Sequence, residues 1–406
     1  MRSPFKKSEP EDIAGPETAT TSFCSSYSDT DALLTSMLAA HEQTSDLIFS
    51  PNRLPQIEVH GQLHDLQVQG MPPMSADDTR RIGSSLIGSN KQAISTLREK
   101  GSCDVSYGLP GIARFRVHVF IQRGSCAVVM RVIPTATPDF GALGLPAALE
   151  EVAALRDGIV LVTGAQGAGK SSTLAALLDL INRVRRCHVI SIEDPIEFLD
   201  PHKEATIHQR ELYSDTPSFA IGLRAALRQS PKVILVGEMR DRETMEMVFE
   251  AAETGHLVLS SLTSIDAEQT VARIVSAFAP AERPSIRARL AKTFRFVVSQ
   301  RLLPGKDGHG RALAVELLQR HPGISEVIQS DDGAGPSILQ AMKRCNPEMQ
   351  HFDGEIEKLV WAGVIEHDAA MTFATDQEAL RIRLSDFFSS AQKNLSGKLS
   401  SAAVSS

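Results

Sequence analysis

The sequence lacks any run of about 18 consecutive apolar residues, the length that a helix needs to span a lipid bilayer. Three basic residues near the N-terminus (Arg2, Lys6 and Lys7) are not followed by an apolar segment, so a secretory signal is not expected. We therefore expect a cytoplasmic protein that associates with a membrane only through partners.

Paired cysteines and an excess of basic residues are also missing. The five cysteines (Cys24, Cys103, Cys126, Cys187 and Cys345) include no C-x-x-C pair, which argues against a zinc site or a redox motif and favours reduced thiols. Lys and Arg number 42 against 49 Asp and Glu, a formal net charge of −7. Because proteins that bind nucleic acids usually carry a basic excess, no nucleic-acid partner is expected.

The chain of 406 residues is long enough for two ordinary domains with tails. Residues 1–30 and 386–406 are rich in small and polar residues, so we predict disordered tails there. Residues 31–134 show mixed α and β patterns, with strands expected near 114–120 and 126–132. The Pro- and Gly-containing segment 135–148 is predicted to be a linker to a second domain, residues 149–385.

The second domain contains four short apolar runs, at 159–162, 189–192, 233–236 and 257–262. Between them lie amphipathic segments, such as the one with Leu174, Leu177, Leu178 and Ile181 on one face. This alternation predicts an α/β fold with a parallel sheet covered on both faces. From about Pro284 onward we expect a helical portion, with Ile286, Leu290, Phe294 and Val297 sharing a face.

A glycine-rich loop follows the first apolar run and precedes an amphipathic helix. It reads G-x-x-x-x-G-K-S and consists of Gly164, Ala165, Gln166, Gly167, Ala168, Gly169, Lys170 and Ser171, with Ser172 next. In this pattern the backbone amides surround a phosphate, the lysine contacts the β- and γ-phosphate oxygens, and the serine hydroxyl binds Mg²⁺. The motif predicts an ATPase with ATP and Mg²⁺ as its ligands; an ordinary glycine-rich turn is the alternative.

Carboxylates follow the second and third apolar runs, where ligands bind in parallel α/β sheets. Glu193, Asp194 and Glu197 come after the second run, and Glu238 comes after the third. Such groups can hold metal-bound water and polarise an attacking water. We predict that Glu193 and Asp194 bind the metal with Ser171 and that Glu197 and Glu238 act in hydrolysis. Either cluster alone could instead be a capped, solvated loop.

Six sequence blocks together resemble the secretion ATPase superfamily, and most closely the type IV pilus retraction (PilT/PilU-like) ATPases. The blocks are GAQGAGKSSTLAALLD (164–179), ISIEDPIEF (190–198), HQRE (208–211), VILVGEMRD (233–241), TGHLVL (254–259) and VSQRLL (298–303). The resemblance covers roughly residues 32–385. It implies a hexamer of two-domain subunits, each with a PAS-like N-terminal domain and a RecA-like ATPase domain.

The resemblance also implies roles for single residues. Glu238 matches the Walker B glutamate, and Glu193, Asp194 and Glu197 match the family's Asp box. Two further matches are expected to be catalytic: His256, the first His-box histidine, and Arg228, in a segment that reads LRAALR at 223–228. Arg116 and Arg131 match nucleotide-binding arginines of the N-terminal domain. Surface ion pairs for the arginines, and a purely structural role for His256, are the alternatives.

Three departures from the family pattern stand out. Thr263 occupies the place of the second His-box histidine, and threonine does not titrate near neutral pH as imidazole does. Residues 228–234 read RQSPKVI where the family usually has REDPDVI, which removes three acidic groups. Residues 323–330 read GISEVIQS where the retraction motif has AIRNLIRE, so both arginines are absent.

The function implied is a hexameric ATPase that powers pilus retraction, as principal or accessory motor. Its partners would be other copies of the chain, an inner-membrane platform protein and a paralogous retraction ATPase, so that it is peripheral to the inner membrane. The departures favour one alternative, a nucleotide-binding regulatory ring with little turnover. Other readings are an assembly or secretion ATPase, which often has two C-x-x-C pairs that this chain lacks, and a RecA-class helicase.

Overall fold

The computed structural model describes residues 29–66, 72–133, 137–306, 310–330, 335–346 and 349–385. The chain divides between residues 135 and 136 into two compact units, each of which is described by itself. The predicted tails lie outside the described residues except for Asp29 and Thr30, which begin the first helix. No described helix has the length and apolar character needed to cross a membrane.

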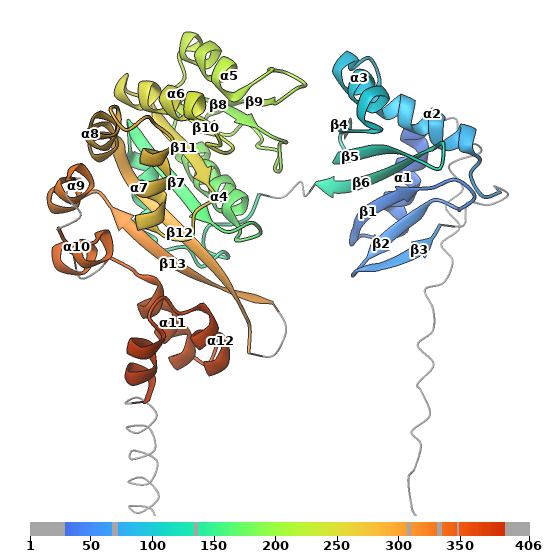
Figure 1. The fold of residues 1–406 in the computed structure, drawn as a ribbon. Helices are drawn as coiled ribbons and strands as arrows, with labels where there is room; N and C mark the ends of the chain where they lie inside the picture. Colours follow the sequence, from blue (N-terminus) through green and yellow to red (C-terminus); the bar gives the residue numbers. More distant parts are fainter. Residues whose placement is uncertain are drawn as a thin grey trace, which may run out of the picture. The chain divides into compact units, whose positions relative to one another are not determined.

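The first unit is an antiparallel sheet of six strands in the order β3-β2-β1-β6-β5-β4, with three helices (Figure 1). Helix α2 packs closely on this sheet, because the space beside Gly83 is filled by side chains of β5 and β6. The elements are α1 Thr30–Ala40, β1 Thr44–Phe49, β2 Gln56–Val59, β3 Gln62–Asp65, α2 Ala76–Ile87, α3 Lys91–Lys100, β4 Ser102–Leu109, β5 Ala113–Gln122 and β6 Ser125–Ile133. The two strands predicted near 114–120 and 126–132 are therefore present as β5 and β6.

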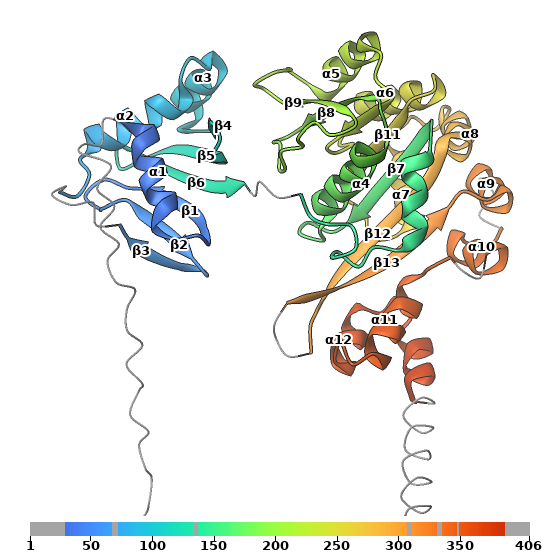
Figure 2. The same ribbon diagram turned by 180° about the vertical axis from the view of Figure 1, so that it is seen from behind.

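The second unit is built on a seven-stranded sheet in the order β13-β12-β7-β11-β10-β8-β9 (Figures 1 and 2). Its strands are β7 Gly158–Gly164, β8 His188–Glu193, β9 Thr206–Glu211, β10 Val233–Val236, β11 Leu257–Leu262, β12 Phe294–Pro304 and β13 Arg311–Gln319. All neighbouring pairs are parallel except β12 with β13. The four predicted apolar runs are β7, β8, β10 and β11, which confirms the predicted α/β sheet.

Helices cover both faces of this sheet, as alternation along β7 requires. Ile159 and Leu161 pack in one core, whereas Val160 and Val162 pack in the other. The elements on the second core are η1 Ala147–Ala154 and α4 Lys170–Val184, and those on the first are α5 Phe219–Ala226 with the following η2 Leu227–Gln229, α6 Arg242–Glu253, α7 Ala267–Ser276, α8 Arg283–Thr293, α9 Pro322–Gln329 and α10 Ile338–Cys345. The segment expected as a linker is partly packed here, because Phe140, Leu143 and Leu145 contact the core beneath η1.

The helical face predicted from Pro284 onward was wrong beyond residue 293. Ile286 and Leu290 lie on α8, but Phe294 and Val297 lie on β12, where both side chains are buried. Residues 294–304 are held in the sheet by β7 on one side and β13 on the other. Phe294 and Val297 continue the helical spacing of Ile286 and Leu290, so the sequence pattern alone did not show where the helix ends and the strand begins.

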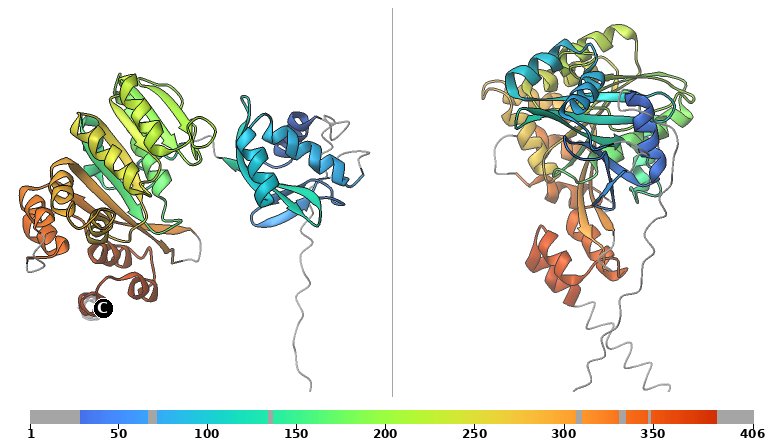
Figure 3. Two further views of the ribbon diagram at one scale, coloured as in Figure 1. Left: turned by 45° about the horizontal axis from the view of Figure 1, so that its top comes forward. Right: turned by 90° about the vertical axis from the view of Figure 1, so that its right-hand side faces the viewer.

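Helices α11 (Phe352–Trp361) and α12 (His367–Phe373), with a further helix at 377–385, form a small cluster against the β12–β13 hairpin (Figure 3). Leu303 and Ala314 of the hairpin are buried in its core with Phe352 and Ile356. Arg301 of β12 places its guanidinium 3.8 Å from the centre of the Phe352 ring and donates to the Phe373 carbonyl oxygen at 2.6 Å. The C-terminal helices are thus fixed to the strand that follows α8.

Candidate nucleotide site

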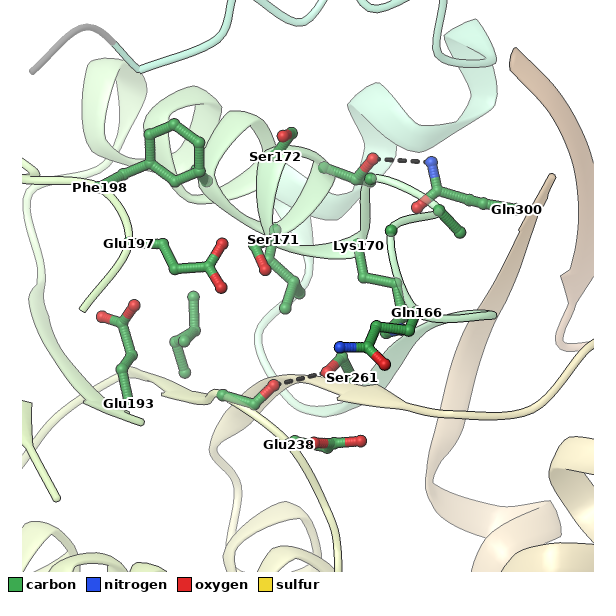
Figure 4. A pocket seen from close by; sticks show the side chains of 18 of the residues that line it. Gln166, Lys170, Ser171, Ser172, Glu193, Glu197, Phe198, Glu238, Ser261 and Gln300 are labelled. Carbon is green, nitrogen blue, oxygen red and sulfur yellow. Dashed lines mark hydrogen bonds between the residues drawn. The ribbon is translucent and has the colours of Figure 1, made fainter. Parts of the chain in front are cut away.

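A pocket of about 840 Å³ lies at the carboxyl end of the second unit's sheet, between the glycine-rich loop and the ends of β8, β10, β11 and β12 (Figure 4). Gln166 to Ser172 line one side of it, and Glu193, Asp194, Glu197 and Glu238 line the other. The structure therefore brings together the loop and the acidic residues that the sequence predicted. A pocket of this volume is large enough for a nucleotide.

The glycine-rich loop connects β7 to α4 through a conformation that only glycine adopts easily. At Gly164 φ is +149°, and an added Cβ would lie 2.8 Å from both the Ala168 Cβ and the Gln300 carbonyl oxygen. Gly169, the N-cap of α4, has φ +87° and no side chain to occupy the first helical amides. The amino end of a 15-residue helix therefore faces the pocket with amides that can bind an anion.

Lys170 folds back onto the loop, where its Nζ donates to the carbonyl oxygens of Gly164 and Ala165, each at 3.0 Å. Desolvation lowers the pKa of Lys170, while the charges of Glu238 and Glu197 oppose that shift. Phosphate oxygens would replace the two neutral acceptors with charged ones, which form stronger hydrogen bonds with an ammonium group.

Glu238 is held by a neutral donor and by a cation. Its Oε1 accepts a hydrogen bond from Thr263 Oγ1 at 2.6 Å, and its Oε2 accepts one from Arg240 Nε at 2.7 Å. Burial raises the pKa of Glu238, but the bonds from Thr263 and Arg240 and the charge of Lys170 outweigh it, so the net pKa is below the usual value. Glu238 is therefore ionised at neutral pH and can accept a proton.

Arg240 also binds Asp194, so it joins the ends of β10 and β8. Its Nη1 donates to Asp194 Oδ2 at 2.7 Å, and its own pKa is raised, mainly by the bond to Glu238. The sequence analysis included Arg240 only as part of the block VILVGEMRD at 233–241 and predicted no role for it. The signal was available, because a cation two residues after a predicted catalytic carboxylate, on the same strand-end loop, is placed to pair with it.

Glu193 differs from the other carboxylates. Its Oε1 accepts hydrogen bonds from Ser191 Oγ at 2.6 Å and from Gln209 Nε2 at 3.2 Å, and burial raises its pKa to about 7. Gln209 also contacts Asp200, whose pKa burial raises to about 7 as well. Glu193 is thus already hydrogen-bonded by two neighbouring side chains, and the metal role predicted for it stays a prediction.

The remaining donors fit a magnesium ion that is bound mainly by substrate. The Ser171 hydroxyl and the Glu197 carboxylate line the pocket, and Asp194 lies there in its ion pair with Arg240. These are hard oxygen ligands, and Mg²⁺ commonly takes one or two from protein and the others from phosphate and water. The described residues contain no group of three or more His, Cys, Asp or Glu side chains arranged for a metal ion.

Gln300 of β12 is a pocket residue that the predicted site omitted. Its Nε2 donates to Thr173 Oγ1 of α4 at 2.8 Å, and its buried Oε1 has no hydrogen-bond partner among the described residues. Gln300 pairs with Gly164 in the strand register, so it lies beside the start of the loop. The VSQRLL block contained this residue, but the expectation of a helix there hid its place on a strand, beside the end of β7.

The structure does not bring His256 into this pocket. His256 precedes β11 and Thr263 follows it, so at about 3.3 Å per residue the two lie about 20 Å apart, at opposite ends of this strand. His256 Nδ1 is 3.0 Å from the Ala251 carbonyl oxygen at the end of α6. In this structure His256 thus contacts the end of α6 and lies outside the pocket lining of its own chain, and its predicted catalytic role stays a prediction.

The three predicted arginines are exposed and lie outside the pocket lining. Arg228 is in η2 and precedes β10, at the edge of the sheet opposite the pocket. Arg116 and Arg131 face each other on β5 and β6 of the first unit, and Arg131 Nε bonds Asp46 Oδ1 at 3.0 Å. Contacts of these arginines with a nucleotide stay predictions, since any such contact would come from another unit or another chain.

Comparisons with known proteins agree with this site. Residues 100–381 match the family model of type II/IV secretion system proteins. The chain is 38% identical over 327 residues to a twitching motility protein of Neisseria gonorrhoeae, covering 80% of this chain and 86% of the relative. It is 34% identical over 341 residues to the type IV pilus ATPase PilU of Pseudomonas aeruginosa, covering 84% and 87%.

A solved structure is similar over almost its whole length. It is the crystal structure of the pilus retraction motor PilT with bound ADP, with a TM-score of 0.78, 37% sequence identity, and coverage of 86% of this chain and 98% of that one.

Proposed function

Since this chain belongs to the family of type II/IV secretion system proteins, we propose that it is an ATP-hydrolysing motor of type IV pilus retraction. The observation that carries the proposal is the position of Glu238, which is ionised and lies in one pocket with Lys170 and Ser171. An ionised carboxylate opposite the phosphate loop can act as the base that hydrolysis requires. The similarity to proteins named for twitching motility and pilus retraction supports the kind of work that hydrolysis drives.

The residues divide the chemistry in the following way. Backbone amides of the loop and the amino end of α4 bind the phosphates, and Lys170 contacts the β- and γ-oxygens. Ser171, with Asp194 or Glu197, would hold Mg²⁺, which neutralises charge on the transferring phosphoryl group when it is bound. Glu238 accepts a proton from the attacking water, because its pKa keeps it in the basic form.

The finer proposals concern assembly and place. A ring of six chains would let an exposed arginine of a neighbour or of the first unit, such as Arg116, Arg131 or Arg228, reach the γ-phosphate and couple hydrolysis to domain movement. A PAS-like identity for the first unit is supported by its six-stranded antiparallel sheet with helices. A cytoplasmic ring held at the inner membrane by a platform protein, with a paralogous ATPase beside it, would follow from the likeness to retraction motors.

Phosphate release by the purified chain tests the hydrolysis proposal. We expect Mg-dependent release that Lys170→Ala and Glu238→Gln both reduce to background. Binding of a fluorescent ADP analogue separates the two variants, because Lys170→Ala should weaken it and Glu238→Gln should retain it. Equal release by wild type and both variants would exclude the motor and would leave the nucleotide-binding regulatory ring, which the changes at 323–330 favour.

Deletion of the gene tests the direction of work. Excess surface pili without twitching would support a principal retraction motor, and normal pilus numbers with weaker retraction would support an accessory one. Loss of pili would instead indicate an assembly ATPase.

A further inference from the structure

The side chain of Thr263 lies where the ends of β10 and β11 meet over the nucleotide pocket. Val236 pairs with Ser260 at the ends of these parallel strands, and beyond them Met239 N donates to the Ser261 carbonyl oxygen at 3.0 Å. Ser261 Oγ donates to the Gly237 carbonyl oxygen at 2.6 Å. These bonds fix the loop that carries Glu238 directly beside the residue that follows β11.

Thr263 itself is fixed at both its backbone and its side chain. Arg273 of α7 donates through Nη1 to the Thr263 carbonyl oxygen at 2.8 Å. A β-branched side chain has few χ1 rotamers, and a hydroxyl has one proton to donate. That proton goes to Glu238 Oε1, at 2.6 Å, so the direction of one carboxylate oxygen is set by a rigid neighbour.

We infer that Thr263 is the positioning residue that orients Glu238 for hydrolysis, a role that rests on the proposed ATPase function. The hydroxyl and Arg240 each take one oxygen of the carboxylate, which removes the rotational freedom of a flexible side chain. A general base must be held within hydrogen-bond reach of its proton donor, and a loose carboxylate meets that condition only part of the time.

Unlike an imidazole, the Thr263 hydroxyl makes a contact to Glu238 that does not itself change with pH in the neutral range. Threonine does not titrate in the neutral range, so its hydrogen bond to Glu238 is present at every pH at which Glu238 is ionised. The other charged groups that line this pocket are Lys170, Arg240, Arg311, Glu193, Asp194, Glu197 and Asp200. Removal of the hydroxyl takes away one group that stabilises the ionised form, so the acidic limb of the rate profile should move to higher pH.

The experiment measures steady-state phosphate release by the full chain between pH 5.5 and 8.5 for wild type and four variants. Thr263→Val keeps the β-branched shape and loses the hydrogen-bond donor. We expect its kcat to be roughly ten- to a hundredfold lower than that of wild type, because a hydrogen bond to a charged group contributes that much, and its KM to stay within about twofold. Its acidic limb should lie at higher pH than that of wild type. Thr263→Ser restores the donor and should recover most of the lost kcat.

Two variants separate orientation from general damage. Thr293→Val removes a buried hydroxyl at the far edge of the sheet, where Thr293 Oγ1 donates to the Arg289 carbonyl oxygen, so it should change neither kcat nor the pH profile. Thr263→His should add a new ionisation near the ordinary imidazole pKa of about 6.5. A structural role for Thr263 alone would lower thermal stability in Thr263→Val without moving the acidic limb.

The outcomes are distinct. If Thr263→Val matches wild type in kcat and in its acidic limb, or if Thr263→Ser is as slow as Thr263→Val, the positioning role is wrong while the ATPase remains. If wild type releases no more phosphate than Lys170→Ala, the proposed function itself fails, and the positioning role fails with it.

Discussion

Glu316 is a buried carboxyl whose protonation should make the stability of the second unit depend on pH. It lies on β13 with 6% of its surface exposed, and its Oε1 accepts a hydrogen bond from the Ala267 amide at the start of α7, at 2.9 Å. Burial raises its pKa to about 7, more than the bond from Ala267 and the charge of Arg301 lower it. The folded protein therefore holds this proton over a pH range in which the unfolded chain has lost it.

The sign and size of the effect follow from linkage. The stabilisation is fully present below the unfolded pKa of about 4.5 and is lost as pH rises through about 7. A difference of about 2.5 pKa units is worth about 3.4 kcal/mol at about 1.36 kcal/mol per unit. About 1.4 kcal/mol of this is already lost by pH 5.5, which leaves about 2 kcal/mol between pH 5.5 and pH 8.5.

Glu316→Gln removes the titrating group and keeps an acceptor for the Ala267 amide. We expect the free energy of unfolding of the variant, relative to wild type, to increase by about 2 kcal/mol between pH 5.5 and 8.5. Urea unfolding of the full chain, followed by a probe of the second unit such as the fluorescence of Trp361, measures this difference. Glu193 and Asp200 titrate in both proteins, so they cancel.

Two results would refute the reasoning. Parallel stability curves for the two proteins would mean that Glu316 has no raised pKa. A variant that is less stable at every pH would mean that Glu316 is ionised and paired with Arg301.

Three further variants test single contacts of the site. Gly164→Ala should weaken binding of a fluorescent ADP analogue more than Gly167→Ala does. A Cβ at residue 164 would lie 2.8 Å from atoms of the loop and of β12, whereas no atom lies near a Cβ at residue 167, so equal affinities of the two variants would contradict this prediction. Arg240→Gln should slow phosphate release more at pH 6 than at pH 8, because Glu238 loses a cation that lowers its pKa. The free energy of unfolding, measured in urea, should change by only about 1 kcal/mol, because the ion pair is half exposed. His256→Ala should lower the melting temperature by a few degrees and change the rate of phosphate release by the isolated chain by no more than about twofold. A tenfold lower rate would mean that His256 takes part in hydrolysis.

The parallel core of the second unit could be predicted because its strands are buried on both faces. The runs that became β7, β8, β10 and β11 are apolar at nearly every position, and each is followed by a glycine-rich or acidic loop. The carboxyl ends of parallel strands lie on the same side of the sheet, so the loop after β7 and the carboxylates after β8 and β10 had to meet there. For the same reason His256, which precedes β11, could have been placed at the other edge from the pattern alone.

The remaining errors concern contacts that depend on three-dimensional pairing. Residues 294–304 carry apolar residues at spacings that fit a helix, and only hydrogen bonds to β7 and β13 make them a strand. The role of Thr263 was also hidden, because the absence of a histidine indicated a loss of function. A hydroxyl in the same place still donates to Glu238, which residue type alone cannot reveal without the distance of 2.6 Å.

Strand β12 joins the nucleotide pocket to the C-terminal helices. Side chains alternate along a strand, so Gln300 faces α4 and the phosphate loop, whereas Arg301 faces Phe352 and the Phe373 carbonyl. The backbone of Gly164 lies close to that of Gln300, because a Cβ added at Gly164 would be only 2.8 Å from the Gln300 carbonyl oxygen. A ligand that moved the loop at Gly164 would therefore displace the Gln300 backbone. Because β12 and β13 are paired along their whole length, such a displacement would be transmitted to the helices that pack on them. The C-terminal helices therefore contact the pocket indirectly, through β12, and contribute no residue to its lining.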